Sequence, residues 1–347
     1  MITLVTGGTG FVGSHVATYY AHRGNQVICY DNLSRARLLK KSINEMYNWN
    51  YLKKFSNIRL IQDDIRDLDK LKKIVKDVDV IIHTAAQTAV TTSIQDPRID
   101  FEVNALGTFN VLEAARLANR DQAIIYCSTN KVYGNNVNKI PVIERETRYE
   151  FKDGFQNGVP ETYPIDLCEH TPYGCSKITG DLYVQDYAHL YGLKTAVFRM
   201  SCIYGIRQFG VEDQGWVAWF TIATILNKPI TIYGNGKQVR DVLYVSDLVN
   251  AFDAFLRRKD QIRHAVFNMG GGPKNTISLL ELLKMLQEIT GKKPKITFGG
   301  WRPSDQLIYV SDISKAEKAL NWKPQVDPKA GVERLVNWVG ENQRILN

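Results

Sequence analysis

The sequence predicts an α/β fold: a doubly wound parallel sheet with a smaller, mixed α/β C-terminal substrate domain. Short apolar runs alternate with helix-like segments over roughly the first 200 residues. The runs are apolar almost throughout, as strands buried on both faces of a parallel sheet are. After about residue 200 the alternation becomes irregular and rich in aromatic residues and prolines. Together these observations indicate a parallel sheet covered by helices, followed by a second domain.

The individual elements follow from the same pattern. Strands are expected at residues 2–6, 26–31, 58–65, 78–85, 123–129 and 194–200. Helices are expected from the first glycines to residue 23 and near 67–77, 99–118, 173–192, 246–258 and 277–290. We expect residues 1–200, with late segments at about 238–270 returning to them, to form the first domain. Residues 201–347 are expected to form mainly the substrate domain, at the carboxyl ends of the strands, where open sheets bind ligands.

The composition excludes several classes of protein. No apolar run approaches the ~20 residues of a membrane span, and the first residues read as a strand and not as a secretory signal. The five cysteines never form CxxC, which favours buried free thiols in a reducing cytoplasm over disulfides or zinc. The net charge of +8 is dispersed along the chain. We therefore expect phosphorylated small molecules as ligands, with no nucleic acid, membrane or metal partner.

A glycine-rich turn, GGTGFVG at residues 7–13, follows the first strand and opens a helix. Absent side chains let the backbone approach a pyrophosphate, which the helix N-terminus attracts. Asp31 ends the second strand, where its carboxylate would accept hydrogen bonds from ribose hydroxyls and repel a 2′-phosphate. NAD is therefore favoured over NADP, despite the nearby Arg35. The alternative is an ordinary glycine-rich loop with a surface aspartate. The combination predicts a Rossmann-type, NAD-binding domain.

Tyr173 and Lys177 stand four residues apart in TPYGCSK, on one face of an expected helix. An ammonium or an oxidised nicotinamide stabilises phenolate, which can take a hydroxyl proton as hydride leaves the same carbon. The spacing alone is also that of an ordinary surface pair. Two hydroxyls, Ser128 and Thr129, end a strand upstream, and one of them can bond the same sugar oxygen. The pattern therefore predicts oxidation and reduction at a hydroxyl-bearing carbon.

Seven stretches together resemble the extended short-chain dehydrogenase/reductase family of NAD-dependent nucleotide-sugar epimerases and dehydratases, over residues 1 to about 335. They are GGTGFVG (7–13), Asp31–Asn32, DDIRD (63–67), HTAAQ (83–87), NALGT (104–108), CSTNKVYG (127–134) and YGCSK (173–177). The resemblance implies Thr129, Tyr173 and Lys177 as the catalytic residues. The NAD site that it implies contains Gly7, Gly10, Phe11, Val12, Gly13, Asp31, Asn32, Ser34, Arg35, Asp64, Ile65, Ala85, Ala86, Gln87, Asn104, Tyr173 and Lys177.

The residues after Thr129 distinguish between reactions of this family. Dehydratases carry Asp-Glu there, as acid and base for the elimination of water, whereas this chain has Asn130 and Lys131. An amide and an ammonium cannot act as a carboxyl pair, so the resemblance implies epimerisation by oxidation and re-reduction. The alternative is that residues 130–131 only shape the loop. His83 ends a strand and is expected to be structural or to pack on the cofactor.

Further stretches resemble the branch of the family that converts CDP-paratose to CDP-tyvelose at C2. They are AVTTSIQDP (89–97), RQFGVEDQGWVAWF (207–220), GNGKQVRDVL (234–243) and the long insert 138–171. This resemblance implies that a nucleotide sugar, with a CDP sugar favoured, is the substrate. The substrate residues that it implies are Thr129, Asn130, Ser201, Cys202, Gln208, Gln214, Arg240, Arg302 and Asp305.

Three points stay open at this stage. The rival functions are a nucleotide-sugar 4-epimerase, like UDP-glucose 4-epimerase, and a non-catalytic NAD-fold scaffold or RNA-binding protein. The insert forms either part of a substrate lid or a surface excursion. The helices expected near 99–118 and 173–192 resemble those that pair across a two-fold axis in this family, which implies a homodimer or homotetramer.

Overall fold

The computed structural model describes residues 1–35 and 46–346, and the chain divides into two compact units. Each unit is assembled from three separate segments of the chain. Unit one consists of Met1–Val132, Thr171–Arg199 and Val249–Phe267. Unit two consists of Tyr133–His170, Met200–Leu248 and Asn268–Asn347. The domain boundaries given above for the sequence stay a prediction.

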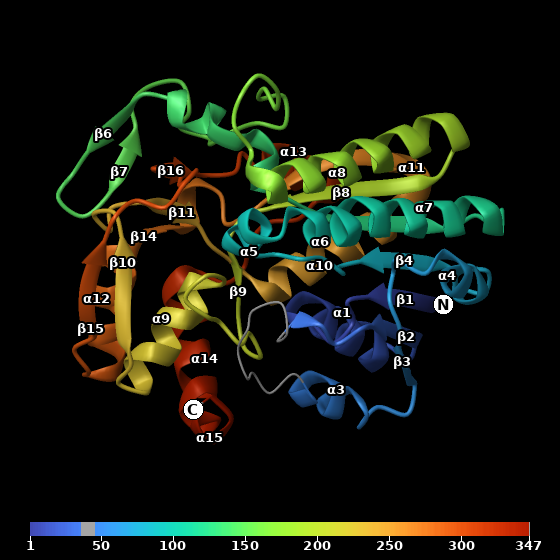
Figure 1. The fold of residues 1–347 in the computed structure, drawn as a ribbon, viewed down its shortest axis with the longest axis horizontal. Coiled ribbons are helices and arrows are strands. Elements are labelled where there is room, and N and C mark those ends of the chain that lie inside the picture. Colours follow the sequence, from blue (N-terminus) through green and yellow to red (C-terminus); the bar gives the residue numbers. More distant parts are fainter. Residues whose placement is uncertain (36–45, 347) are drawn as a thin grey trace. The chain divides into compact units, whose positions relative to one another are not determined.

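Unit one is built on a seven-stranded sheet with the strand order β13-β8-β5-β4-β1-β2-β3 (Figure 1). Strand β1 pairs in parallel with both β2 and β4, so the order of the strands reverses beside β1. Ligands of doubly wound sheets bind at such a switch point. The predicted Rossmann-type parallel sheet is confirmed. Its strands are β1 (Ile2–Thr6), β2 (Gln26–Asp31), β3 (Ile58–Gln62), β4 (Val80–His83), β5 (Ala123–Thr129), β8 (Lys194–Met200) and β13 (His264–Met269).

Helices α4, α7 and α8 of unit one form a row in which α7 contacts both neighbours (Figure 1). Helix α1 instead packs against β1, β2 and α3. The helices that lie wholly or partly in unit one are α1 (Phe11–His22), α3 (Met46–Leu52), α4 (Leu68–Val75), α5 (Val90–Gln95), α6 (Pro97–Phe101), the π-helix η1 (Glu102–Leu106), α7 (Gly107–Ala118), α8 (Thr171–Tyr191), α10 (Val245–Leu256), α11 (Lys259–Ile262) and the 3-10 segment η2 (Asn130–Lys139).

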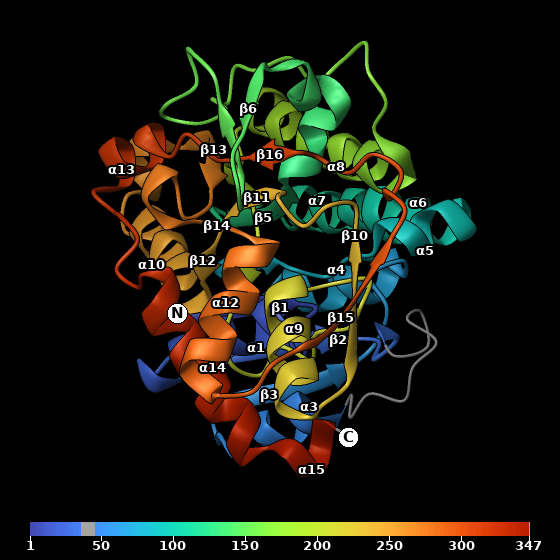
Figure 2. The ribbon, with the colours of Figure 1, turned by 90° about the vertical axis from the view of Figure 1, so that its left-hand side faces the viewer.

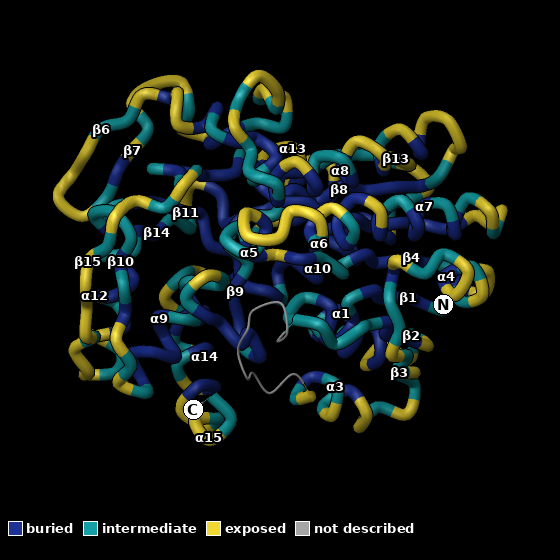
Figure 3. Tube along the Cα trace, viewed as in Figure 1, coloured by how far each residue is buried: buried dark blue, intermediate teal, exposed yellow. Residues whose placement is uncertain are grey.

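The central strands are apolar because they are covered on both faces. Strands β4 and β5 are buried along their whole length. Figure 3 shows the buried backbone of the molecule in dark blue. Leu4, Ile81 and Ile124 face one another across β1, β4 and β5 and belong to one hydrophobic cluster. Each such side chain contributes about 1.5–3 kcal/mol on burial. The same packing fixes the carboxyl ends of these strands, from which the site residues extend.

Unit two contains small sheets and a group of three helices, α9, α12 and α14, that contact one another (Figure 2). Strands β10 and β15 pair in parallel, β14-β11-β16 form a three-stranded sheet, and β9 pairs with β12. Its elements are β6 (Val142–Glu144), β7 (Tyr149–Phe151), β9 (Ile203–Tyr204), α9 (Trp216–Ile225), β10 (Pro229–Tyr233), β11 (Val239–Asp241), β12 (Leu243–Tyr244), η3 (Pro273–Asn275), β14 (Thr276–Ser278), α12 (Leu279–Thr290), β15 (Lys295–Gly299), β16 (Ile308–Tyr309), α13 (Ser314–Leu320), α14 (Pro328–Glu341) and α15 (Gln343–Leu346).

The long insert is anchored in unit two by backbone and core contacts. The N–H of Val159 donates to the carbonyl of Val310 at 2.7 Å, and its own carbonyl accepts from Asp312 at 3.0 Å. Its hairpin, β6 and β7, places Tyr149 in a hydrophobic cluster with Val239. The insert is therefore tied to unit two at both its hairpin and its later residues.

Some expectations need correction. The helix predicted over 99–118 is interrupted by the π-helix η1, in which the N–H of Gly107 bonds to the carbonyl of Glu102. The strand predicted over 58–65 ends at Gln62, because the acidic residues that follow form a turn closed by their own side chains. The five cysteines are free, but Cys175 is exposed and only Cys29 and Cys127 are buried. No helix among the described residues is long and apolar enough to span a membrane.

Candidate active site

The glycine turn between β1 and α1 leaves no room for side chains. Gly7 has a φ of +66°, and a Cβ there would lie 2.7 Å from the Cα of Ala85, on the loop after β4. A Cβ at Gly13 would lie 2.2 Å from the carbonyl oxygen of Gly7. Only glycine fits these two positions without a shift of the backbone. The turn therefore forms a cradle of bare backbone at the switch point between β1 and β4.

Helix α1 begins directly in this cradle. Gly10 is its N-cap, and the N–H of Gly10 donates to the carbonyl of Gly7 at 3.0 Å. Phe11 and Val12 follow as the first helical residues, both half-buried. The first N–H groups of an α-helix have no partner within the helix, and the helix dipole adds positive charge there. The arrangement fits the pyrophosphate of a dinucleotide.

Asp31 ends β2 beside the glycine turn. Its Oδ2 accepts a hydrogen bond of 3.0 Å from the backbone N–H of Thr9, and its Oδ1 accepts one of 2.9 Å from that of Leu33. These bonds fix the carboxylate at the carboxyl end of the strand. Each oxygen keeps acceptor capacity, because a carboxylate oxygen has two lone pairs. Asp31 is thus a fixed carboxylate with acceptor capacity beside the glycine turn.

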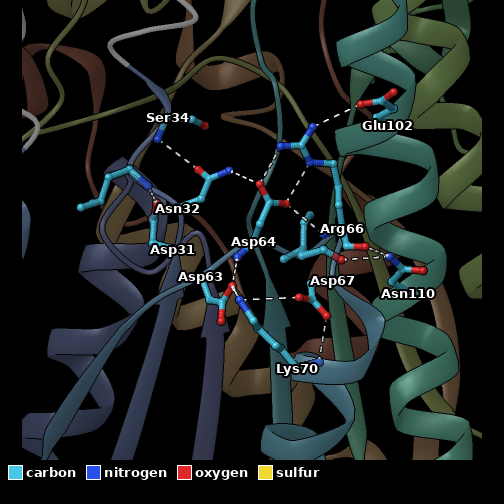
Figure 4. Close-up of polar contacts among 12 residues, drawn as sticks. Asp31, Asn32, Ser34, Asp63, Asp64, Arg66, Asp67, Lys70, Glu102 and Asn110 are labelled. Atoms are coloured by element: carbon cyan, nitrogen blue, oxygen red, sulfur yellow. Dashed lines mark hydrogen bonds and ion pairs between the residues drawn. The ribbon is translucent and has the colours of Figure 1, made fainter.

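A cluster of polar side chains joins the ends of β2 and β3 (Figure 4). Asn32 donates to Asp64 at 2.7 Å and accepts from the N–H of Ser34 at 3.0 Å. The guanidinium of Arg66 donates to both oxygens of Asp64, at 3.0 and 2.8 Å, and to Glu102 at 3.2 Å. Partial burial opposes ionisation, but the hydrogen bonds from Arg66 and Asn32 lower the pKa of Asp64 to about 2. Asp64 is therefore a fixed anion at this end of the site.

Ile65 and Arg35 directly follow Asp64 and Ser34 in the chain. Ile65 is buried against the start of α7, where a Cβ added to Gly107 would lie 2.5 Å from its Cδ1. Its carbonyl accepts a hydrogen bond from Asn110 of α7 at 3.1 Å. The turn after β3 is thus fixed to α7 by both packing and a hydrogen bond. Burial lowers the pKa of Arg35 to about 10, so the guanidinium stays charged at neutral pH.

Gln87 and Asn104 turn their side chains into the protein. Asn104 accepts from the N–H of Gln87 at 2.9 Å and donates to its carbonyl at 3.0 Å. Both side-chain amides also donate to Asp100, at 2.8 and 3.1 Å, and both residues are almost fully buried. In this arrangement they hold the loop after β4, on which Ala85 and Ala86 are half-buried.

Tyr173 lies close enough to Thr129 for the Thr129 side chain to influence the ionisation of the phenol as a hydrogen-bond partner. Thr129 ends β5, and Tyr173 lies in the first turn of α8, where its N–H donates to Ser93 at 3.1 Å. Burial raises the pKa of Tyr173 to about 12, and the charge of Asp100 adds to this, whereas Thr129 lowers it. The phenol is therefore protonated at neutral pH until a ligand brings positive charge beside it.

Lys177 lies one turn after Tyr173 on the same helix. Its Nζ donates to the carbonyl of Cys127 at 2.7 Å and lies 4.2 Å from the centre of the Tyr126 ring. Burial lowers the pKa of Lys177 to about 8, and nearby acidic groups oppose this. The ammonium thus faces the end of β5, while the strongest electrostatic influences on the Tyr173 phenol come from Thr129 and Asp100.

A buried ion pair supports the end of β5 from the other side. The Ser128 hydroxyl donates to Asp181 at 2.7 Å, and Arg199 donates to both oxygens of Asp181, at 3.0 and 3.1 Å. The Ser128 hydroxyl is therefore bonded in the protein interior, and of the two strand-end hydroxyls it is Thr129 that acts on the pKa of Tyr173. The alternation of side chains along a strand explains this division of roles.

His83 is a buried side chain held between two threonines. Its ring nitrogens lie 2.6 Å from the hydroxyl of Thr6 and 3.0 Å from that of Thr108, and its ring stacks on Tyr126. Burial, with the charge of Lys177, lowers the pKa of His83 to about 3. A neutral imidazole with both nitrogens occupied links β1, β4 and α7, which agrees with the structural role expected for it.

Asn130 and Lys131 follow Thr129 at the start of η2. The Thr129 hydroxyl lies 3.3 Å from Oδ1 of Asn130 and accepts from the backbone N–H of Lys131 at 3.2 Å. Asn130 is buried and Lys131 is half-buried. The two residues therefore orient the Thr129 hydroxyl, and neither supplies a carboxylic acid beside it.

In unit two, the predicted phosphate-binding arginines are each paired with an acid. Arg240 donates to Asp305 at 2.8 Å, and Gln238 lies 3.3 Å from the other oxygen of Asp305. The guanidinium of Arg302 lies 4.0 Å from the centre of the Tyr233 ring and 3.2 Å from Asp213. Unit two thus holds two oriented guanidiniums, a carboxylate and an aromatic ring, which are the groups that bind phosphates, ribose and a base.

The remaining predicted substrate residues also lie in unit two. Ser201 is fully buried and donates from its hydroxyl to the carbonyl of Asp241 at 3.4 Å. Cys202 has a φ of +38°, and its sulfur accepts from the indole of Trp216 at 3.4 Å. Gln208 is buried and donates to the carbonyl of Ile203 at 3.2 Å. Gln214 forms an isolated bridge with Val211.

Sequence reasoning missed four polar residues around α8, the helix of Tyr173 and Lys177. Asp100, Ser176 and Ser93 are linked to Tyr173 or to its helix, and Asp181 holds Ser128. The four-residue spacing of Asp100 and Asn104 was the available signal for the first of them. The others depend on contacts between segments that lie far apart in the sequence.

The chain matches the family described as GDP-mannose 4,6 dehydratase over residues 4–335. Because this covers nearly the whole chain, the chain belongs to this family of NAD-dependent epimerases and dehydratases. The predicted extended short-chain dehydrogenase/reductase class is confirmed, and with it an NAD-dependent, nucleotide-sugar enzyme in place of a non-catalytic scaffold.

Particular relatives narrow the comparison. CDP-paratose 2-epimerase of Salmonella typhi is 42% identical over 345 residues, which cover 97% of this chain and 99% of that protein. UDP-glucuronate 4-epimerase of Thermodesulfobacterium geofontis is 30% identical over 348 residues, 99% of this chain and 97% of the relative. The crystal structure of UDP-glucuronic acid 4-epimerase from Bacillus cereus, in complex with UDP-glucuronic acid and NAD, matches with a TM-score of 0.82 at 28% identity, covering 99% of this chain and 100% of that one.

Proposed function

We propose that this chain is an NAD-dependent epimerase that converts CDP-paratose to CDP-tyvelose by inversion at C2. The observation that carries the epimerase is the contact of α8 with the end of β5, where Lys177 binds the carbonyl of Cys127 at 2.7 Å and Tyr173 lies beside Thr129. An amide and an ammonium follow Thr129 in place of two acids. The choice of sugar is supported by the 42% identity to the Salmonella CDP-paratose 2-epimerase, against 30% to a UDP-glucuronate 4-epimerase.

NAD fits the residues of unit one. The cradle that a Cβ at Gly7 or Gly13 would fill accommodates a pyrophosphate, and Asp31 is oriented to accept from a ribose. The residues proposed to hold the adenosine end are Asn32, Ser34, Arg35, Asp64 and Ile65. When bound, NAD supplies a hydride acceptor that later returns the hydride to the same carbon.

The residues of the chain handle the proton. Thr129 orients the hydroxyl of the sugar, and Tyr173 takes its proton as the carbon is oxidised. Tyr173 gives the proton back when the carbon is reduced from the opposite face. Lys177, fixed on the carbonyl of Cys127, adds positive charge that favours the phenolate. The net redox change is zero, so added cofactor is not consumed.

Elimination of water is disfavoured by the groups beside Thr129. Dehydration requires an acid to protonate the leaving hydroxyl and a base to remove a proton from carbon. Asn130 is buried with its amide oxygen 3.3 Å from the Thr129 hydroxyl, and the backbone of Lys131 binds the same hydroxyl. Both residues therefore support the orientation of Thr129 and leave epimerisation as the proposed outcome.

The nucleotide is proposed to bind to unit two. Arg240 and Arg302 are held in place by Asp305 and Asp213, so their guanidiniums are oriented before a ligand arrives. A diphosphate can take over these donors bidentately, while Asp305 is left to accept from a ribose hydroxyl. Ser201, Cys202, Gln208 and Gln214 remain proposed contacts of the sugar nucleotide.

The decisive experiment uses three nucleotide sugars and identifies the products. CDP-paratose, CDP-glucose and UDP-glucose are incubated separately with the purified enzyme in deuterated solvent, and the products are analysed by NMR. We expect CDP-tyvelose from CDP-paratose, without deuterium at the inverted carbon. Deuterium at that carbon would exclude direct hydride return, and turnover of UDP-glucose alone would exclude the CDP-sugar assignment.

A nucleotide-sugar 4-epimerase is the second candidate. It is favoured by the full-length similarity to UDP-glucuronate 4-epimerase from Thermodesulfobacterium geofontis. The same residues would serve it, because the choice between C2 and C4 depends on the orientation of the sugar and not on the tyrosine. The product of the UDP-glucose incubation, compared with that from CDP-paratose, separates the two.

A homodimer or homotetramer is also proposed, formed through the helices of unit one. Leu182, Tyr183 and Leu190 are large apolar residues exposed on α8, and Phe101, Leu106 and Leu117 are exposed on the segment from α6 to α7. Two such helices from each copy can form a four-helix interface. Light scattering should show an oligomer that Leu182→Glu dissociates, whereas a monomeric wild-type enzyme would exclude this assembly.

A further inference from the structure

The segment between α5 and α7 contains a buried acid that the proposed proton transfer does not use. Asp100, in α6, has no exposed surface. Helix α6 starts at a side-chain cap from Asp96 and runs into the π-helix η1. Single π turns of this kind are frequent at functional sites. A carboxylate with no access to solvent needs an explanation, because burying a charge is unfavourable unless it is well bonded.

Asp100 collects hydrogen bonds from three different segments. Gln87, on the loop after β4, and Asn104, in η1, donate to its Oδ1 at 2.8 and 3.1 Å. Ser176, on α8, donates from its hydroxyl to Oδ2. Amide N–H groups can only donate, so at least one oxygen of Asp100 must act as an acceptor. The carboxylate is the common acceptor that joins the three segments.

The third of these segments is the helix that carries the reacting groups. Ser176 lies between Tyr173 and Lys177, and its hydroxyl oxygen is also 3.1 Å from the carbonyl of Tyr173. The N–H of Tyr173 is held separately by Ser93. The backbone around the tyrosine is thus fixed on both sides, and one of these attachments leads to Asp100.

The charge of Asp100 also acts on the pKa values of Tyr173 and Lys177, the two titratable side chains that α8 brings to the site. It raises the pKa of Tyr173, on which Thr129 acts in the opposite direction, and it raises the pKa of Lys177. Cys127 and Asp181 act on Lys177 in the same direction as Asp100, against its burial. Burial raises the pKa of Asp100 itself, while Ser176, Gln87 and the charge of Lys177 lower it.

The same segment extends to the other end of the cofactor site. Glu102, two residues after Asp100, accepts from Arg66, which in turn binds both oxygens of Asp64 (Figure 4). Asp100 and Glu102 therefore connect one short stretch of backbone to the catalytic helix and to the turn after β3.

We propose that Asp100 is a positioning residue, which holds the first turn of α8 against the loop after β4 and so directs Tyr173 toward the cofactor. This rests on the proposed function in that Tyr173 transfers the proton, but not on which sugar is the substrate. Asp100 is fully buried and acts through Ser176, Gln87 and Asn104.

Asp100→Asn is the direct test, with Asp96→Asn as its matched control. The control makes the same change four residues away at an exposed helix cap, where Asn caps as well as Asp. In Asp100→Asn an N–H₂ group replaces an acceptor and the charge is lost. We expect kcat to fall about 10- to 100-fold, with a smaller change in KM. Both limbs of the pH–rate profile should move to lower pH, because Asp100 no longer raises the pKa of Tyr173 and Lys177.

A purely structural defect would lower the rate without moving these limbs. The phenol of Tyr173 is also titrated by ultraviolet absorbance with NAD bound, as the difference from the matching Tyr173→Phe protein. This measurement needs no sugar, so it still decides the role of Asp100 if no nucleotide sugar is turned over and the proposed function fails. A phenol midpoint and pH–rate limbs in Asp100→Asn equal to those of the wild type, whether or not kcat falls, would overturn the proposal.

Ser176→Ala covers the case in which Asp100→Asn does not fold. This variant keeps the carboxylate and its two amide donors but removes its bond to α8. We expect a lower kcat with the limbs of the pH–rate profile unmoved, since Asp100 remains ionised. A wild-type kcat in Ser176→Ala would show that Asp100 does not act through the helix and would overturn the proposal as well.

Discussion

The ammonium of Lys177 lies 2.7 Å from the backbone carbonyl oxygen of Cys127, which ties the helix bearing Tyr173 to the last residues of β5. The bond places a buried positive charge two residues before Thr129 along the strand. Because burial lowers the pKa of Lys177 to about 8, this charge is maintained only below that pH. Both the reaction and the stability of the protein should therefore depend on the ionisation of one lysine.

Turnover is expected to decrease as pH rises through about 8, where Lys177 loses its proton. The lowered pKa of Lys177 also makes the stability of the protein depend on pH. A lysine in the unfolded chain has a pKa of about 10.4, so between about pH 8 and that value the unfolded chain binds more protons than the folded one. The free energy of unfolding therefore rises with pH in this range. Chemical denaturation at a series of pH values, compared with Lys177→Met, measures this contribution. A slope equal in both proteins would contradict it.

Lys177→Met should separate activity from stability. We expect a loss of about 10²-fold or more in turnover, because the phenolate loses a stabilising charge. Thermal unfolding near neutral pH should occur at the same or a higher temperature, since a buried charge is replaced by an apolar chain of similar length. A variant that is active, or that unfolds well below the wild type, would be inconsistent with the site described.

Tyr173→Phe is expected to remove nearly all turnover, about 10²- to 10⁴-fold, while NAD remains bound. Thr129 lowers the pKa of the Tyr173 phenol, so Thr129→Val should also lower turnover, whereas Thr129→Ser keeps the hydroxyl and serves as its control. Steady-state rates and the NAD content of each purified protein provide the measurement. Near-normal rates in Tyr173→Phe would refute the assignment.

Gly13→Ala should abolish NAD binding or folding of the turn, since the new Cβ would lie 2.2 Å from the carbonyl oxygen of Gly7. Gly340→Ala, in α14, is the matched control, because nothing lies within 4 Å of its added Cβ. Replacing a helical glycine by alanine should stabilise the control by about 0.5–1 kcal/mol. Calorimetric titration with NAD and thermal unfolding test both; equal NAD affinity in the two variants would argue against the cradle.

Arg66→Met should raise the pKa of Asp64 and weaken the binding of NAD. The folded-state pKa of Asp64, about 2, lies below that of an unfolded aspartate, so its interactions stabilise the fold above about pH 4. This contribution is lost as pH falls toward 2, and it is modest because both side chains are partly exposed. Lys70→Met, which removes the more exposed pairs with Asp63 and Asp67, is the control. Equal NAD affinity in the two variants would exclude a role for Arg66.

The fold and the central site were predictable because their signals are local. The strand, glycine turn and helix around Gly7 and Gly13 stand within one short stretch, and Tyr173 and Lys177 are one helical turn apart. Asp100 could not be found in this way, because its partners at positions 87, 104 and 176 are joined only by the folded chain. The inward orientation of Gln87 and Asn104 depends on the same carboxylate, and the π-helix that carries Asn104 leaves no mark in the apolar periodicity.

The three-segment construction of unit one has a consequence for the newly synthesised chain. The seventh strand of its sheet ends at Met269, so the ribosome must translate most of the message before that sheet can close. Until then the edge of β8 lacks its neighbour β13, and exposed strand edges are prone to aggregate. A shortened gene that stops after β8 would therefore yield an insoluble fragment rather than a free-standing dinucleotide-binding module.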